Sequence, residues 1–146
     1  MTDWVSQPAQ PSLAAVERAV DAGLNEARTR GIDIAIAVVD PAGQPICLKR
    51  MDAARPVTAD LAVAKARMAA IHRRDTHLFQ GLAAPGAPAY GVQFHAAGGT
   101  GILPGGLTIA SNLGLHGAVG ASGADRDGDI ACAEAARSAL LITLPE

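Results

Sequence analysis

Glycine in the last third of the chain constrains the fold more than any other feature of the sequence. Nine of the sixteen glycines fall between Gly98 and Gly123. A glycine inside a helix costs about 1 kcal/mol relative to alanine, so a helix through this region is disfavoured. The glycines separate short apolar runs and form turn signals at Gly105-Gly106 and at 112–114. The pattern predicts three short strands, at Gly101–Pro104, Leu107–Ser111 and Leu115–Ser122.

A helix and a hairpin are predicted in the first third of the chain. Ser12 precedes an apolar stripe at helical spacing, and Gly31 ends it. The β-branched run Ile34–Val39 is followed by turn residues at 40–43, and Ile46–Arg50 resumes an extended pattern. These two runs predict a β-hairpin.

Two further helices are predicted. Thr58 or Asp60 could cap a second helix that runs to about Arg74, and Asp125 or Asp127 could cap a last helix. The expected apolar face of the second helix consists of Leu61, Ala64, Met68 and Ile71. The element order is therefore α-β-β-α-β-β-β-α. It indicates a single α+β domain over 1–146, with an antiparallel five-stranded sheet flanked by helices and a flexible N-terminal segment at 1–11.

Composition excludes several classes of protein. The net charge is −2, and Lys and Arg are dispersed along the chain, which argues against a nucleic-acid partner. No apolar run approaches the roughly 20 residues of a membrane span, and the N-terminus lacks an export signal, so we expect a cytoplasmic protein without a membrane partner. Cys47 and Cys132 are expected to be free thiols.

The balance of apolar and charged residues predicts self-association. Hydrophobic residues make up 49% of the chain and charged residues only 18%, which is little charge to cover a small monomer. We therefore expect one face to be buried in a homo-oligomer.

Two apparent ligand loops are better explained as local structure. The glycine pairs near Gly99 and Gly105 lack the Gly-Lys-Ser/Thr ending of a phosphate loop. The alternating carboxylates at 125–129 resemble a calcium loop, but Ala136 stands where a bidentate Glu is needed. Helix capping accounts for these aspartates more simply.

The segment His72–His77 is the densest group of polar side chains. His72 and Thr76 would share a helical face if the helix continued that far. A solvated basic helix end is one interpretation, and a zinc site is weakly indicated because too few ligands converge. The other interpretation is a ligand-facing role, in which His72 contacts a heme iron or Arg73 and Arg74 bind an anion.

Other candidates lie on either side of this segment. Arg50, Lys65 and Arg67 could hold a carboxylate or a propionate, although each alone is more typical of a solubilising charge. The stretch 80–99 could be a lid, a binding loop or a poorly ordered connection. His95 and His116 are isolated, and His116 is expected to be a structural residue in a strand.

Several segments together resemble the GlcG/HbpS-like family, which includes the C-terminal part of PduO-type proteins. The matching segments are 37–43, 48–54, 64–67, Thr76, 103–106, 117–123 and 127–133. The resemblance implies a profilin-like antiparallel sheet that assembles into dimers or larger rings. It also implies heme as a cofactor, with Thr76 in contact with it. Met68 and His72 depart from the family pattern.

Three functions remain open at this stage. In the first, a heme-binding accessory protein contacts the propionates through basic residues near Lys65 and Arg73, with Thr76 or His72 near the iron. In the second, a small catabolic enzyme of isomerase or lyase type binds a carboxylated metabolite through Arg50, Lys65 or Arg67, with His72 as acid and base. The third is a structural oligomer whose groove has no catalytic role.

Overall fold

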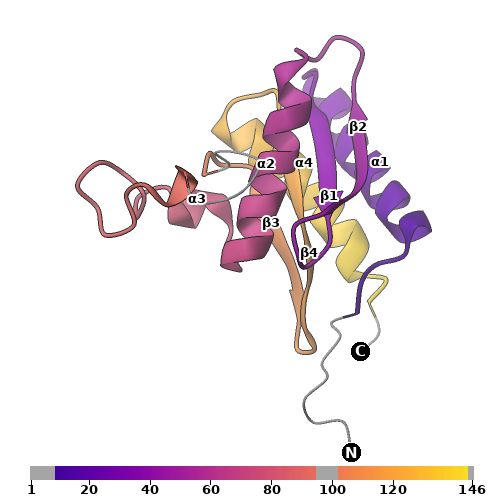
Figure 1. Cartoon of the computed structure of the whole chain (residues 1–146). Coiled ribbons are helices and arrows are strands. Elements are labelled where there is room, and N and C mark those ends of the chain that lie inside the picture. The colour runs from indigo at the N-terminus through magenta and orange to yellow at the C-terminus, as the bar shows by residue number, and fades with distance from the viewer. Residues whose placement is uncertain (1–8, 95–101, 145–146) are drawn as a thin grey trace, which may run out of the picture.

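The computed structural model describes residues 9–94 and 102–144 (Figure 1). Four strands form one antiparallel sheet in the order β2-β1-β4-β3. Helices α1 and α4 cover one face of this sheet, and α2 covers the other. The strands are β1 (Ala35–Val39), β2 (Pro45–Arg50), β3 (Gly106–Ser111) and β4 (Gly114–Ser122), and the long helices are α1 (Leu13–Arg30), α2 (Val57–His72) and α4 (Arg126–Leu141).

The two faces of the sheet carry side chains of different size. Ile36, Val38, Leu107 and Val119 belong to the main core under α1 and α4. The opposite face presents alanine and glycine to the alanines of α2, so backbone meets backbone closely. A Cβ atom added to Gly120 would lie 2.0 Å from the carbonyl oxygen of Ala62. The glycines that punctuate this region therefore let α2 rest directly on the sheet.

Two predicted helices and four predicted strands form as expected, and the helices do so because their end signals are local. The Ser12 hydroxyl accepts from the Ala15 amide at the start of α1, and Gly31 ends that helix at φ 67°. The Asp125 carboxylate accepts from the Gly128 amide and caps α4. The predicted hairpin is β1 and β2, and the predicted strands at 107–111 and 115–122 are β3 and β4.

The prediction of five strands is wrong, since the described residues form four. Ile102–Pro104 is not a strand, and Gly101 lies outside the described residues. Pro104 has no amide hydrogen to give to a sheet. The outer amides of β3, where a fifth strand would pair, are already bonded to side chains of Asp75 and Thr76.

The second helix also differs from the prediction. Neither Thr58 nor Asp60 caps α2: the helix begins at Val57, and the Thr58 hydroxyl donates to the Arg55 carbonyl. Arg73 ends α2 in the left-handed region at φ 51°, so His72 and Thr76 do not share one helix. The predicted apolar face is only half right, because Ile71 is 46% exposed while Ala64 and Met68 are buried. The helix uses alanine to approach the sheet, so its larger side chains do not mark its inner face.

The segment after α2 contains structure that the sequence did not indicate. Thr76–Phe79 forms a one-turn helix, α3, and Val92–Phe94 forms a 3-10 turn at the end of a series of turns. Figure 1 shows α3 and the following turns extending away from the sheet. The rest of the predicted loop, 95–99, including His95, lies outside the described residues. Residues 1–8 of the predicted flexible N-terminal segment also lie outside them. Within the described ranges, no helix has the length and apolarity that crossing a membrane requires.

Candidate functional site

Lys65 of α2 forms a buried ion pair with Asp129 of α4, although the two residues lie 64 positions apart. Lys65 is only 2% exposed, and its Nζ atom lies 2.7 Å from Asp129 Oδ2. The same ammonium donates to the Ala121 carbonyl at 2.9 Å. The Ala124 amide donates to the other carboxylate oxygen of Asp129 at 2.8 Å. The pair joins α2 to α4 at the end of β4.

Burial raises the pKa of the Asp129 carboxyl above its ordinary value. The hydrogen bond and the charge of Lys65 act in the opposite direction, as do backbone amides, but they offset the burial only in part. The carboxylate therefore depends on the ammonium for its charged state. Removing either partner would leave the other as an uncompensated buried group.

A hollow of about 320 Å³ opens beside this ion pair. Lys65 and Asp129 form part of its wall, together with Gln80, Leu103, Pro104, Ala124 and Arg126. The Gly105-Gly106 turn permits the close packing here. A Cβ atom on Gly105 would lie 2.6 Å from the Ala121 carbonyl oxygen and 3.3 Å from Lys65 Nζ, and its φ of 117° also requires glycine.

Thr76 and Asp75 close the outer edge of β3. The Thr76 hydroxyl accepts from the Gly106 amide at 3.0 Å and donates to the Leu103 carbonyl at 2.7 Å, and Thr76 is fully buried. One Asp75 oxygen accepts from the amide of Thr108 at 2.8 Å and from its hydroxyl at 3.0 Å. The two side chains occupy successive edge positions of the strand. The Thr76 hydroxyl thus has its partners inside the fold.

Arg137 completes this closure from the other side of the sheet. Its guanidinium extends from α4 to Asp75 at 3.1 Å and to the Thr108 carbonyl at 3.4 Å, and it also pairs with Glu134. Asp75 follows α2, so the Asp75–Arg137 strap connects helices on opposite faces around the β3 edge.

The structure places Arg50, Lys65 and Arg67 in three different surroundings. Arg67 Nε donates to the Gly43 carbonyl at 3.0 Å and fixes the β1–β2 turn against α2. Arg50 is exposed at the end of β2. These three residues therefore do not converge on one ligand, and Lys65 alone lines the hollow beside Asp129.

His72 and Arg73 lie at the exposed end of α2. The His72 ring stacks on Phe79 of α3, with 4.9 Å between ring centroids and an interplanar angle of 27°. The Arg74 guanidinium lies 5.7 Å from the centroid of the same Phe79 ring. His77 Nδ1 is buried without a hydrogen-bond partner among the described residues. One imidazole and one guanidinium thus meet around the Phe79 ring.

Several exposed apolar side chains lie close to Phe79 in the sequence. Leu78 is 61% exposed, Tyr90 58% and Phe94 75%. Three of the four aromatic residues of the chain fall in the short segment 79–94. We call residues 72–94 the arm. It combines imidazole, guanidinium and exposed aromatic groups, a combination suited to a flat apolar ligand that carries anionic groups.

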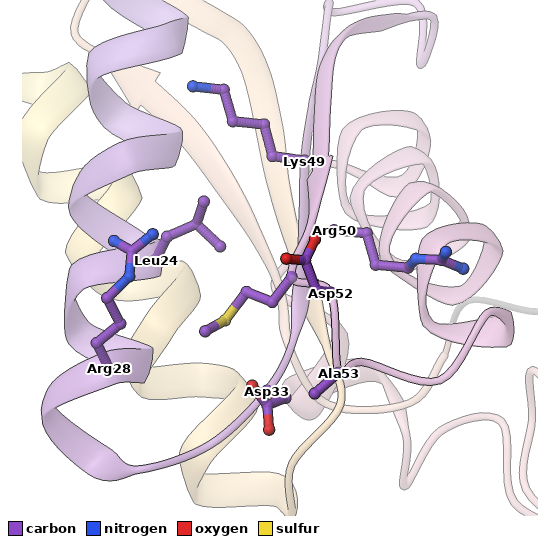
Figure 2. A pocket seen from close by; sticks show the side chains of 8 residues that line it. Leu24, Arg28, Asp33, Lys49, Arg50, Asp52 and Ala53 are labelled. Atoms are coloured by element: carbon purple, nitrogen blue, oxygen red, sulfur yellow. The ribbon is translucent and has the colours of Figure 1, made fainter.

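A larger groove of about 600 Å³ lies between α1 and the end of β2 (Figure 2). Leu24 and Arg28 of α1 face the strand, and Lys49 extends toward α1 whereas Arg50 extends to the opposite side. Lys49 Nζ pairs with Asp21 at 2.6 Å, and this hydrogen bond raises the pKa of Lys49. The remaining lining residues are Asp33, Met51, Asp52 and Ala53. Positively and negatively charged side chains therefore both line this groove.

The sequence identified several residues of the site but not the side chains with which they form ion pairs. Asp129 was interpreted only as one of the helix-capping carboxylates at 125–129, and Arg137 was not selected as a candidate. The weak signal for Asp129 was its place one turn inside α4 beside buried alanines. His116 is a buried strand residue as expected, with Nε2 2.7 Å from the Ser111 hydroxyl and Nδ1 2.7 Å from the Ala9 carbonyl. Both cysteines are free thiols.

Comparison with known proteins finds similarity over nearly the whole chain. The family model described as "Haem degrading protein HbpS-like" matches residues 12–138. An uncharacterized 15.0 kDa protein of Citrobacter freundii, from the dhaT-dhaS intergenic region, is 33% identical over 130 residues, which cover 89% of this chain and 92% of that one.

Two solved structures share the fold at recognisable sequence identity. The ORFY protein of Klebsiella pneumoniae superposes with a TM-score of 0.91 at 28% identity, covering 99% of both chains. The crystal structure of a PduOC:heme complex superposes with a TM-score of 0.84 at 27% identity, covering 90% of this chain and 95% of the other.

Proposed function

The chain belongs to the HbpS-like family, and from that premise we propose that it is a small heme-binding accessory protein that acts as a homo-oligomer in the cytoplasm. The observation that carries the proposal is the superposition on a heme complex over 90% of the chain. The two free thiols accord with a reducing compartment.

The arm supplies the groups that a heme needs. We assign the iron ligand to His72, because its ring stacks on Phe79 next to the Arg74 guanidinium, whereas His116 is fully buried in β4. Arg73 and Arg74 would meet the propionates. Bound heme would supply iron for redox or oxygen chemistry, with its potential set by the axial ligand and the surrounding polarity.

Thr76 receives a different role from the one that the family resemblance implied. Its hydroxyl would have to leave the Leu103 carbonyl and the Gly106 amide before it could approach an iron. Such a move would also expose the edge of β3. We therefore propose that Thr76 positions the start of the arm and does not contact heme.

Hemin titration tests the proposal. We expect the wild-type protein to shift the Soret band away from that of free hemin. The variant His72→Phe keeps an aromatic ring to stack on Phe79 but removes both ring nitrogens, so the shift should be lost and hemin affinity should fall at least about tenfold. The double variant Arg73→Glu with Arg74→Glu should weaken affinity several-fold through charge reversal near the propionates.

Two control variants make the titration decisive. Arg18→Ala removes an exposed arginine on α1, far along the chain from the arm, and should leave the spectrum unchanged. His77→Phe should also retain the shift. A shift lost in His77→Phe and kept in His72→Phe would overturn the assignment of His72, and a free-hemin spectrum with the wild-type protein would overturn heme binding altogether.

An enzyme that uses Lys65 and His72 on one metabolite is the second candidate, and the geometry favours it less. The two residues lie seven positions apart on α2, which corresponds to about 10 Å along the helix axis. Lys65 faces the hollow beside Asp129, and His72 stacks on Phe79. A small substrate would not touch both side chains.

A further inference from the structure

We propose that the hollow beside Lys65 and Asp129 is a binding site for a small carboxylate, held between the Lys65 ammonium and the Arg126 guanidinium. This site shares Gln80 with the arm but includes none of the proposed heme contacts at 72–74, and it does not depend on heme binding. The fold brings its residues together from separate parts of the chain: Lys65 of α2, then Gln80, then Leu103 and Pro104, and finally three residues at or just before the start of α4, Ala124, Arg126 and Asp129.

The Lys65 ammonium has one hydrogen left to donate. A lysine ammonium carries three donors. Only two oxygens accept from Nζ among the described residues, those of Ala121 and Asp129. A donor hydrogen that is buried without an acceptor costs free energy, and a carboxylate oxygen is one of the strongest acceptors available. Since Lys65 lines the hollow, a ligand oxygen there can complete its hydrogen bonding.

The charges around the hollow favour an anion over a cation. The charges of Lys65 and Asp129 balance each other within their ion pair. Arg126 also lines the hollow, is exposed, and makes no hydrogen bond or ion pair with the described residues. Its guanidinium can bind a carboxylate with two parallel hydrogen bonds. Gln80 adds an amide that can donate a further hydrogen bond.

The size of the hollow limits the ligand to a short acid. Its volume of about 320 Å³ lies at the lower end of the range for small-molecule sites. The wall at Gly105 cannot retreat, because this backbone packs against the Ala121 carbonyl. A compact acid with one or two carboxylates fits this description, whereas a nucleotide or a porphyrin exceeds it.

Titration with malonate, followed in amide nitrogen–proton NMR spectra of the full chain, tests the site. We expect saturable shifts at the amides of Gln80, Leu103, Gly105 and Ala124. Malonamide has the same shape without charge, so it should cause no comparable shifts. Equal shifts with both compounds, or malonate shifts confined to other parts of the chain, would overturn the proposal.

A matched pair of arginine variants gives the second measurement. Arg126→Gln should weaken malonate binding at least about tenfold, since it removes one charge-assisted contact. Arg28→Gln alters another arginine that lines a concavity, the groove of Figure 2, and should leave the malonate affinity unchanged. Equal malonate affinity in Arg126→Gln and wild type would overturn the site. The Soret shift of Arg126→Gln with hemin should equal that of wild type, which separates this site from the proposed heme site.

Discussion

At the scale of single residues, burying the Lys65–Asp129 pair costs desolvation free energy but fixes α2 against α4. Two charges are withdrawn from water, yet each finds hydrogen bonds: Lys65 with the Ala121 carbonyl, and Asp129 with the Ala124 amide. Such a pair is costly to break because the remaining group stays buried. The pair therefore fixes how α2 and α4 meet while holding an ammonium at the hollow.

Replacing Lys65 by methionine should change both the stability and its pH dependence. We expect Lys65→Met to lower the free energy of unfolding by about 3–5 kcal/mol near neutral pH, because Asp129 loses its buried partner. The pKa of Asp129 in the folded protein, already raised by burial, should rise further without the ammonium. The folded state would then hold the proton more tightly than the unfolded state, where an Asp titrates near about 3.9.

The sign of the pH effect follows from proton binding. Where the folded state binds more protons, the free energy of unfolding falls as the pH rises. Urea unfolding of Lys65→Met between about pH 4 and 8 should therefore show a steeper fall in stability than wild type. The double variant Lys65→Met with Asp129→Leu should lose this excess slope. Parallel pH profiles for wild type and Lys65→Met would contradict the assignment of Asp129 as its source.

At the scale of elements, α2 is defined by how closely it lies on the sheet. Ala62 and Ala66 meet Gly120, and the Lys65 carbonyl meets Gly106, where a Cβ atom would lie 2.3 Å away. Side chains larger than these would separate the layers. The glycines of β3 and β4 thus position the helix that carries Lys65.

A single methyl group should test this contact between layers. Gly120→Ala should destabilise the fold by about 1–3 kcal/mol or more, because the new Cβ atom meets backbone atoms of α2 that cannot rotate away. Gly81→Ala is the matched control, since no atom lies within 4 Å of its added Cβ and its φ is not positive. Denaturant midpoints of the two variants supply the measurement. Equal midpoints would mean that α2 can shift outward without cost.

Local signals made part of the fold predictable from the sequence. The caps at Ser12 and Asp125, the glycine stop at Gly31 and the hairpin turn each act within a few residues. The fifth strand was predicted wrongly because the edge of β3 is closed by Asp75 and Thr76, some 30 residues earlier in the chain. Sequence spacing does not reveal such a partner.

The sequence predicted some residues of the candidate site but not how they are arranged in space. Lys65 was selected as a charged side chain, yet its burial depends on Asp129 and on the small residues of β4, which only the folded chain brings near. The inner face of α2 was misread for a related reason. Apolar periodicity weights large side chains such as Ile71, while this helix buries its alanines.

At the scale of the whole molecule, apolar surface remains uncovered. Leu78 and Phe94 of the arm and Ile142 beyond α4 are all more than half exposed. Surfaces of this kind in a compact protein commonly mark contacts with a partner or a ligand. A second copy placed against the arm would cover its aromatic side chains and could enclose heme between the two chains.

Sedimentation velocity should therefore detect an oligomer at micromolar concentration. Leu78→Ser with Phe94→Ser should shift the distribution toward single chains, because the arm loses apolar area to bury. Ile142→Ser alters a comparably exposed apolar side chain outside the arm, at the end of α4, and should leave the assembly unchanged. A wild-type protein that sediments as a single chain at about 100 µM would contradict self-association.

The Asp75–Arg137 strap bears on which edge of the sheet can pair with a strand of another chain. Along β3 the outward amides of Gly106 and Thr108 are sealed by side chains, whereas in the described part of the molecule nothing seals the outward amides of Leu48 and Arg50 on β2. A chain that joins by strand pairing has only the β2 rim to use. Two copies joined there would form one continuous sheet with a sealed rim at each end, so that growth by strand addition would terminate at the dimer and a fibril could not propagate.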